Sequence, residues 1–231
     1  MSLYLWLHIA TVSFPLVRSF EPRIAYASRW RALFPGILLT AAFFIIWDVI
    51  FTKDGVWGFN ADYLTGLFLF HLPIEEWLFF FTVPFASVFI YDCVVYFDKG
   101  NKLNIKLNWL ATLLGALLII LALVSYGKDY TFYNFLFAGL LLVIHGLWLK
   151  SAYLGHFFIA YLIHLIPFLL VNGVLTGGVT EEPIVWYNNA ENIGVRIWTI
   201  PVEDTVYALL LLLMNITYYE FFKSRLGLKH N

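Results

Sequence analysis

Residues 73–76 read Pro-Ile-Glu-Glu, and residues 201–204 read Pro-Val-Glu-Asp. Each run places a proline and two adjacent carboxylates at the start of a long apolar segment, and the two runs are 128 residues apart. Carboxylates next to hydrocarbon are energetically costly, so the presence of a pair in each of the two runs indicates a specific role for these acids. The four acids are Glu75, Glu76, Glu203 and Asp204.

The composition indicates an integral membrane protein. Of the 231 residues, 61% are hydrophobic and only 13% are charged, and a soluble domain could not hide so much apolar surface. The net charge of −1 gives no sign of a nucleic-acid partner, and Cys93 as the single cysteine rules out a disulfide framework. No basic residue precedes Arg18, unlike in a secretory signal, so we expect the first apolar segment to be retained.

Seven apolar segments are long enough, or nearly so, to cross a bilayer, which takes about 20 helical residues. The predicted fold class is therefore an all-α integral membrane protein with seven transmembrane helices. Pro84 and Pro167 fall inside the third and sixth helices and are expected to kink them. The helices are expected at about 3–20, 33–52, 74–95, 108–126, 132–149, 154–175 and 202–222.

The lysines and arginines predict the orientation. Only Lys53, Lys128 and Arg196 lie on one side of the predicted membrane, and the other 11 of the 14 basic residues lie on the opposite side. The positive-inside rule then places the N-terminus outside and the C-terminus in the cytoplasm, with the chain in the cell (inner) membrane. The eleven are Arg18, Arg23, Arg29, Arg31, Lys99, Lys102, Lys106, Lys150, Lys223, Arg225 and Lys229.

The 128-residue offset predicts an internal repeat. It also relates Asn60 to Asn188 and Gly66 to Gly194, and it maps the first three helices onto the last three, with the second and sixth displaced by several residues. Because four helices separate the copies, both have the same orientation, which makes a parallel 3+1+3 repeat. We therefore expect one membrane domain, 1–231, composed of a first three-helix repeat (1–97), a linker helix (98–130) and a second repeat (131–231).

The doubled acids have two interpretations. Proline and acidic residues are favoured in the first turn of ordinary helices, so a single motif would indicate no more than a helix start. Two motifs at equivalent positions favour catalysis. Adjacent helical residues point about 100° apart, so one acid of each pair should face the bundle interior and the other a neighbouring helix or the interface. Apolar surroundings disfavour the charged form of a carboxyl, which predicts a neutral acid that can donate a proton.

Further polar residues are expected in the same layer. Asp48 and Asn172 lie near the ends of the second and sixth helices, which reach the level of the acids, and His71 precedes Pro73 by two residues. Packing, lipid contact and stabilisation of a carbocation all remain open for the aromatic run that begins at Trp77. The isolated histidines lack a second ligand one turn away and no nucleotide-binding motif is present, so neither a metal nor a nucleotide cofactor is predicted.

The residues resemble a known family. The stretch Trp47-Asp48, Gly55-Val56-Trp57-Gly58-Phe59-Asn60 and Pro73-Ile74-Glu75-Glu76-Trp77-Leu78-Phe79-Phe80 resembles the first half of the small membrane-embedded lycopene cyclases of bacteria, archaea and fungi. The second half is similar at Asn172-Gly173-Val174-Leu175-Thr176-Gly177 and at Pro201-Val202-Glu203-Asp204, so both halves are fused in one chain.

The resemblance implies a carotenoid cyclase that protonates the open ψ-end of lycopene or a related polyene and closes a β- or ε-ring through a carbocation. Such a reaction conserves atoms and needs no redox cofactor. The resemblance implies catalysis by Glu75, Glu76, Glu203 and Asp204. Together with the expected polar layer, it suggests eight residues in substrate-binding or supporting positions: Asp48, Trp57, Asn60, His71, Pro73, Trp77, Asn172 and Pro201.

The competing interpretation is a small seven-helix transporter, because such transporters also contain parallel 3+1+3 repeats. A transporter should carry polar residues along its axis toward both sides, whereas the acids here gather at one level. For a cyclase we expect both acid pairs at one depth. The polyene should reach them from the lipid through an aromatic-lined cavity between the second, third, sixth and seventh helices.

Overall fold

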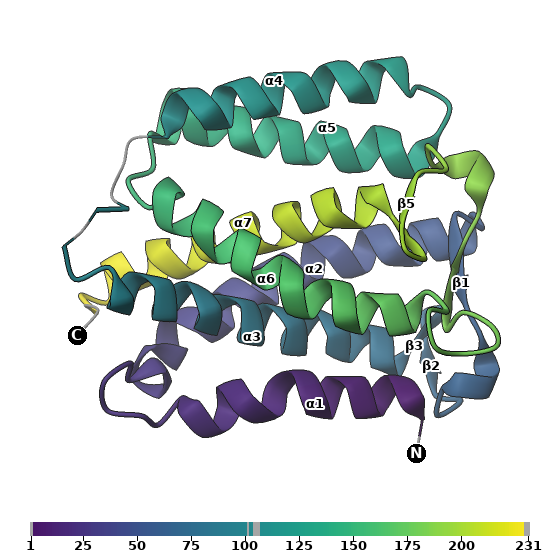
Figure 1. Cartoon of the computed structure of the whole chain (residues 1–231), viewed down its shortest axis with the longest axis horizontal. Coiled ribbons are helices and arrows are strands. Elements are labelled where there is room, and N and C mark those ends of the chain that lie inside the picture. The colour runs from purple at the N-terminus through teal and green to yellow at the C-terminus, as the bar shows by residue number, and fades with distance from the viewer. Residues whose placement is uncertain (1, 101, 104–106, 229–231) are drawn as a thin grey trace.

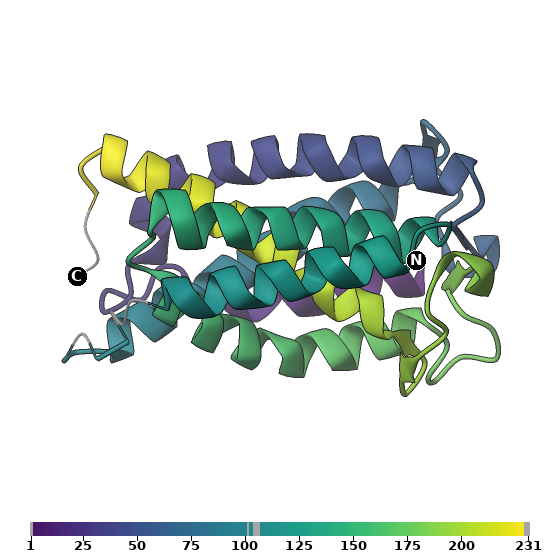
Figure 2. The ribbon, with the colours of Figure 1, turned by 90° about the horizontal axis from the view of Figure 1, so that it is seen from above.

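The computed structural model describes residues 2–100, 102–103 and 107–228. In this part of the chain seven α-helices run side by side, and the two ends of the chain lie at opposite ends of the bundle (Figures 1 and 2). The helices are α1 (Leu3–Arg18), α2 (Trp30–Lys53), α3 (Ile74–Phe97), α4 (Asn108–Val124), α5 (Asp129–Ile144), α6 (Leu154–Leu175) and α7 (Val202–Arg225).

Five helical segments are long and apolar enough to cross a membrane. The prediction of a mostly helical membrane protein is confirmed. Helices α1 and α4, with 16 and 17 residues, are shorter than the roughly 20 residues of a full span, so seven crossings stay a prediction. The five segments are Tyr26–Lys53, Ile74–Phe97, Asp129–Leu149, Leu154–Leu175 and Val202–Arg225.

The expectation of an all-α chain is wrong in detail, because short antiparallel strands close the end of the bundle near residue 2 (Figure 1). The loops that precede α3 and α7 are too long to stay unpaired near hydrocarbon, where free backbone groups are costly. Strand pairing satisfies part of this backbone. The pairs are β1 (Trp57–Phe59) with β4 (Val185–Tyr187), β2 (Phe68–Leu69) with β3 (Leu72–Pro73), and β5 (Arg196–Ile197) with β6 (Ile200–Pro201).

Local structure recurs at the 128-residue offset. Gly66 and Gly194 both have φ +82°, and Phe70 and Trp198 are both left-handed, with φ +50° and +59°. The β1–β4 pair is centred on Gly58 opposite Trp186, which are themselves 128 residues apart. An antiparallel pair of this kind is what a twofold axis through its centre generates. A side chain at Gly58 would clash, because its Cβ would lie 2.3 Å from the Trp186 ring.

The helices pack in two groups. Helix α3 contacts α1 and α6, α7 contacts α2 and α5, and α3 and α7 meet in the middle. Helix α4 lies at the periphery against α5 (Figure 1), where a Cβ on Gly115 would lie 2.6 Å from the Gly139 carbonyl oxygen. Such close approach through small residues is typical of membrane helix pairs. Helix α5 begins at Asp129, so the predicted repeat boundary at 131 falls inside its first turn.

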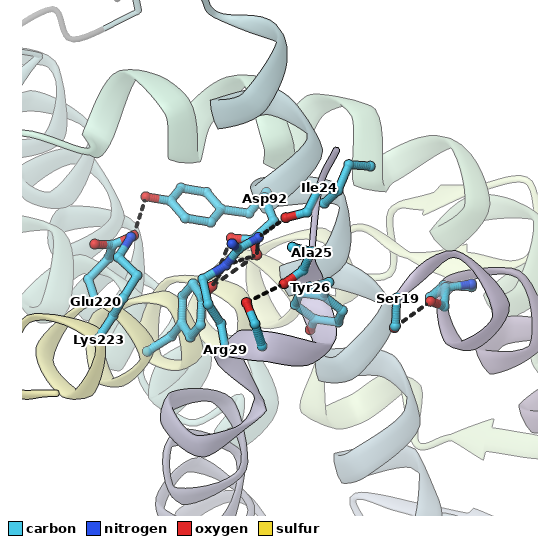
Figure 3. Close-up of polar contacts among 12 residues, drawn as sticks. Ser19, Ile24, Ala25, Tyr26, Arg29, Asp92, Glu220 and Lys223 are labelled. Atoms are coloured by element: carbon cyan, nitrogen blue, oxygen red, sulfur yellow. Dashed lines mark hydrogen bonds and ion pairs between the residues drawn. The ribbon is translucent and has the colours of Figure 1, made fainter. Parts of the chain in front are cut away.

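A cluster of buried polar side chains holds α3 and α7 together at the end of the bundle away from the strands (Figure 3). The Tyr219 hydroxyl of α7 donates to Asp92 of α3 at 2.9 Å, and the Tyr91 hydroxyl of α3 donates to Glu220 of α7 at 2.8 Å. The two tyrosines are 128 residues apart, and so are the two acids. Arg29 pairs with Asp92 at 2.8 Å, and both are almost fully buried, so the acid is paired within the apolar interior.

We expect Arg29→Met to destabilise the protein by about 3–5 kcal/mol, because it removes the cation from a buried ion pair and leaves the Asp92 charge behind. Unfolding of the purified protein in detergent, followed by circular dichroism, measures the loss. The double variant Arg29→Met/Asp92→Leu removes both charges and should regain most of the stability. Equal stability of wild type and Arg29→Met would contradict this account of the cluster.

Candidate active site

One acid from each motif lines the same small cavity, which has a volume of about 50 Å³. Glu76 comes from the first turn of α3, Asp204 from the first turn of α7, and Asp48 from the last turns of α2. All three acids are under 10% exposed. The rest of the lining is mostly aromatic, and it consists of Tyr4, Trp57, Phe59, Phe79, Tyr130, Phe168, Asn172, Leu175, Val185, Tyr187 and Tyr207.

The two hairpins fix where α3 and α7 begin. Pro73 and Pro201 end the hairpins in extended conformation, and each is the residue at which the following helix starts. Both prolines are buried, so each acid pair enters the bundle in the first helical turn. The free N–H groups and the positive end of the helix dipole stabilise negative charge at this place.

The outer acid of each pair braces the preceding loop. Oε1 of Glu75 accepts hydrogen bonds from the Thr65 amide and the Ser2 hydroxyl, each at 2.7 Å. Oε1 of Glu203 accepts equivalent bonds from the Ile193 amide and the Thr131 hydroxyl, also at 2.7 Å. Neither acid lines the cavity, and both are fully buried. The two acids of each motif therefore face different surroundings.

Asp204 is the most strongly hydrogen-bonded of the three cavity acids. Its Oδ2 accepts from Asn172 at 2.6 Å and from the Tyr187 hydroxyl at 2.9 Å, and its Oδ1 accepts a short bond from the Tyr130 hydroxyl. Burial and the neighbouring charge of Asp204 raise the pKa of Tyr187 well above its ordinary value, so Tyr187 stays a donor. Three donors stabilise the carboxylate form of Asp204.

Glu76 is bound on one side only. The Tyr4 hydroxyl donates to its Oε2 at 2.6 Å, and no residue in the described part of the chain donates to its Oε1. The Tyr4 ring stacks on His8 with centroids 4.8 Å apart, which holds the hydroxyl in place. Asp48 also has a single partner, because Trp57 donates from Nε1 to its Oδ1 at 2.5 Å. The cavity thus combines one carboxylate that accepts three hydrogen bonds, Asp204, with two acids that accept one each, Glu76 and Asp48.

Not every residue predicted from the sequence lies at the cavity. Asp48, Trp57 and Asn172 line it, and Pro73 and Pro201 set the helix starts beside it. Asn60 instead caps the 3₁₀ turn η2 (Ala61–Tyr63), as Asn188 caps η4 (Asn189–Glu191).

The structure does not bring His71 and Trp77 into the lining of the acid cavity. His71 is exposed at the tip of the β2–β3 hairpin with φ +68°, because the turn carries its side chain outward. Trp77 lies one helical position past Glu76, about 100° around the helix, and its Nε1 donates to the Leu69 carbonyl at 3.2 Å.

Sequence reasoning missed the tyrosines. Tyr4 and Tyr130 donate to Glu76 and Asp204 from the first turns of α1 and α5, and both are buried. They are 126 residues apart, so an offset of 128 does not align them. The available signal was a tyrosine near the start of each of two helices. A search at the 128-residue offset of the acids does not find this pair.

The acid cavity lies between the four helices predicted for it, because its lining includes Asp48 of α2, Phe79 of α3, Asn172 of α6 and Asp204 of α7. A cavity of about 420 Å³ lies between α1, α3 and α6, and it shares Phe79, Phe168, Asn172 and Leu175 with the acid cavity. This wider cavity has α1 in its lining in place of α2 and α7, and the sequence did not predict it. As for metals, within the described residues no three or more histidine, cysteine or acidic side chains gather closely enough to hold an ion.

Comparison with known families gives one match. The family model described as lycopene cyclase matches residues 1–94 and 127–222, which is most of the chain. The stretch between the two matched segments contains α4. No curated protein and no solved structure matches the chain.

Two replacements of Glu203 should distinguish its role as a hydrogen-bond acceptor for the preceding loop from any role of its negative charge. Glu203→Gln keeps an acceptor for the Ile193 amide and the Thr131 hydroxyl, whereas Glu203→Ala leaves both donors unsatisfied at a cost of about 1–3 kcal/mol. We therefore expect faster amide hydrogen exchange in residues 188–197 of Glu203→Ala, measured by mass spectrometry, and near wild-type exchange in Glu203→Gln. Unchanged exchange in Glu203→Ala would show that Glu203 does not brace this loop.

Proposed function

The chain belongs to the lycopene cyclase family, and from this premise we propose that it closes the open ψ-end of a carotenoid polyene into a β- or ε-ring inside the acid cavity. The family implies an enzyme that acts on a carotenoid polyene. The observation that carries the proposal is the meeting of Glu76 and Asp204, from two distant motifs, in one buried aromatic cavity.

In the proposed reaction Glu76 protonates the terminal double bond of the ψ-end. The neighbouring double bond attacks the resulting tertiary cation and forms the six-membered ring, and the ring cation then loses a proton to leave a new double bond. One proton enters and one leaves, so the product is an isomer of the substrate and no electrons are exchanged. This makes the activity an intramolecular lyase or isomerase reaction that needs no redox cofactor.

Hydrogen bonding divides the roles between the acids. We assign the proton donor to Glu76, because its Oε1 has no partner in the described chain, its carboxyl lines the cavity, and it is the counterpart of Asp204 at the 128-residue offset. Asp204 stays a carboxylate because three donors stabilise it, and it opposes the positive charge of the intermediate and accepts the departing proton. Asp48 contributes a further acidic group, held by Trp57.

Aromatic side chains in the cavity stabilise the carbocation intermediate and keep water away from it. Tyr207, Phe79 and Phe168 line the cavity beside the acids, and aromatic faces attract positive charge. The acids are buried and the lining is mostly aromatic, which limits access of the water that would quench the cation as an alcohol. Glu75 and Glu203 support this geometry by fixing the loops before α3 and α7.

We extend the proposal to the membrane arrangement: seven crossings in a parallel 3+1+3 repeat, with the N-terminus outside and the C-terminus in the cytoplasm. The matched hairpins, 3₁₀ turns and tyrosine–acid contacts support the repeat, as do two matched segments that flank α4. The basic residues support the orientation, although Lys106 and Lys229 lie outside the described residues. Family membership does not favour the transporter alternative.

The first test uses cells that accumulate lycopene. The wild-type chain should convert lycopene to cyclic carotenoids, and Glu76→Gln should lower the rate by about 10²–10⁴-fold because the amide cannot donate an acidic proton. Glu75→Gln is the matched control, since it changes the adjacent acid outside the cavity. Pigment analysis per unit of membrane protein gives the rates. Wild-type cyclisation by Glu76→Gln would refute the donor assignment, and failure of the wild type would refute the function.

The second test concerns cofactors. Purified protein in liposomes that contain lycopene should form cyclic product without added flavin, nicotinamide nucleotide or metal, because protonation and deprotonation balance. Product is measured by chromatography, with and without a chelator. An absolute requirement for a reduced nucleotide or a divalent ion would contradict the redox-neutral mechanism.

A further inference from the structure

The cavity of about 420 Å³ is a groove that opens on the side of the bundle. Helix α3 forms its floor, and α1 and α6 form its walls, without close packing between those two helices. Phe14 of α1 and Leu170 of α6 line it and are 66% and 65% exposed, so it opens on an outward face. In a membrane protein that face borders lipid.

The groove continues into the acid cavity. Phe79, Phe168, Asn172 and Leu175 line both, so a molecule in the groove extends directly to the acids. Asn172 marks the junction, because its Nδ2 donates to Asp204 at 2.6 Å. A chain that enters here arrives beside the most strongly hydrogen-bonded carboxylate.

The groove fits a hydrocarbon chain. Its lining on α3 runs from Phe79 to Ile90, about 16 Å along the helix, which is roughly half of a 30 Å hydrocarbon core. Its polar side chains include Ser87 and His164, which bond to each other at 3.0 Å, while Ser87 also donates to the Val83 carbonyl at 2.7 Å. The rest of a long polyene would remain in the bilayer.

Only one of two equivalent places is open. The repeat that relates α1, α3 and α6 to α5, α7 and α2 would put a second groove between α5 and α2. Aromatic rings fill that place instead: Phe137 lies 5.6 Å from Phe43 and 5.4 Å from Trp47, and Tyr133 lies 6.0 Å from Phe51, between ring centroids. The two halves share one acid cavity, and of the two equivalent places only the one between α1, α3 and α6 forms a groove that leads to it.

We propose that the groove between α1, α3 and α6 binds the unreacted part of the polyene and guides one end group at a time to Glu76 and Asp204. This inference rests on the proposed function. A polyene with two open ends must then leave and re-enter in reverse to receive its second ring. The enzyme therefore releases a one-ring product before any two-ring product forms.

The test separates binding from catalysis. Glu76→Gln should trap unreacted lycopene, and the bound pigment is measured by absorbance after purification from lycopene-producing cells. Ala86→Phe on the groove floor and Ala10→Trp at its rim, each added to Glu76→Gln, should lower bound lycopene by about tenfold or more. Ala42→Trp is the matched control, because Ala42 is an exposed helical alanine that does not line the groove.

The same three substitutions are made in the otherwise wild-type chain. Ala86→Phe and Ala10→Trp should slow cyclisation by about tenfold or more, whereas Ala42→Trp should not, at equal amounts of monodisperse protein. With substrate in excess, the earliest product should carry one ring. Ala10 is already exposed, so Ala10→Trp tests the groove even where Ala86→Phe disturbs folding.

The outcomes distinguish the two proposals. Full lycopene binding and cyclisation by both groove variants would overturn the groove, and wild-type cyclisation in the same assay would leave the function intact. Loss of bound phospholipid with retention of lycopene would identify a lipid site and also overturn it. Two-ring product at the earliest times would refute entry of one end at a time. An inactive wild type would remove the function on which the inference rests.

Discussion

Four carboxyl groups are buried in the first turns of two membrane helices, and each must find hydrogen bonds or lie free in an apolar interior. The structure answers this demand in two ways. Glu75 and Glu203 accept from backbone amides and hydroxyls, which fixes the loops before α3 and α7. Glu76 and Asp204 turn the other way and meet tyrosines, so the need to satisfy buried acids produces both the closed end of the bundle and its reactive centre.

The two halves of the chain have a similar backbone arrangement but differ in the side chains that line the acid cavity. Asp204 has three hydrogen-bond donors and Glu76 has one, and α6 carries Asn172 at the cavity where α2 carries Asp48. A symmetric pair of acids would have similar proton affinities and could not readily act as donor and acceptor in one turnover. The divergence of the repeats therefore matters as much as their likeness, and the same holds for the groove that only one half keeps open.

Much of the fold and part of the site were accessible from the sequence. Apolar length located the helices, and the 128-residue offset identified Glu76 and Asp204, because helix starts and acid motifs are local features. The tyrosine donors escaped, since α1 and α5 are displaced relative to the acids and side-chain reach does not follow chain spacing. His71 lies outside the cavity lining, at an exposed hairpin tip where left-handed residues reverse the chain. The side on which the groove opens depends on Phe43, Trp47 and Phe137 packing together, which no linear pattern encodes.

The exchanged contacts at the far end, Tyr91 with Glu220 and Tyr219 with Asp92, have the form of an interface between two copies of one subunit. Under the proposed repeat, each copy crosses the membrane three times, so direct fusion would invert the second copy. In that arrangement α4 would supply the extra crossing, and among the helices it packs chiefly on α5. Under the proposed repeat, the chain has the form of two joined copies of one subunit, with α4 as the helix that lets both copies keep the same orientation.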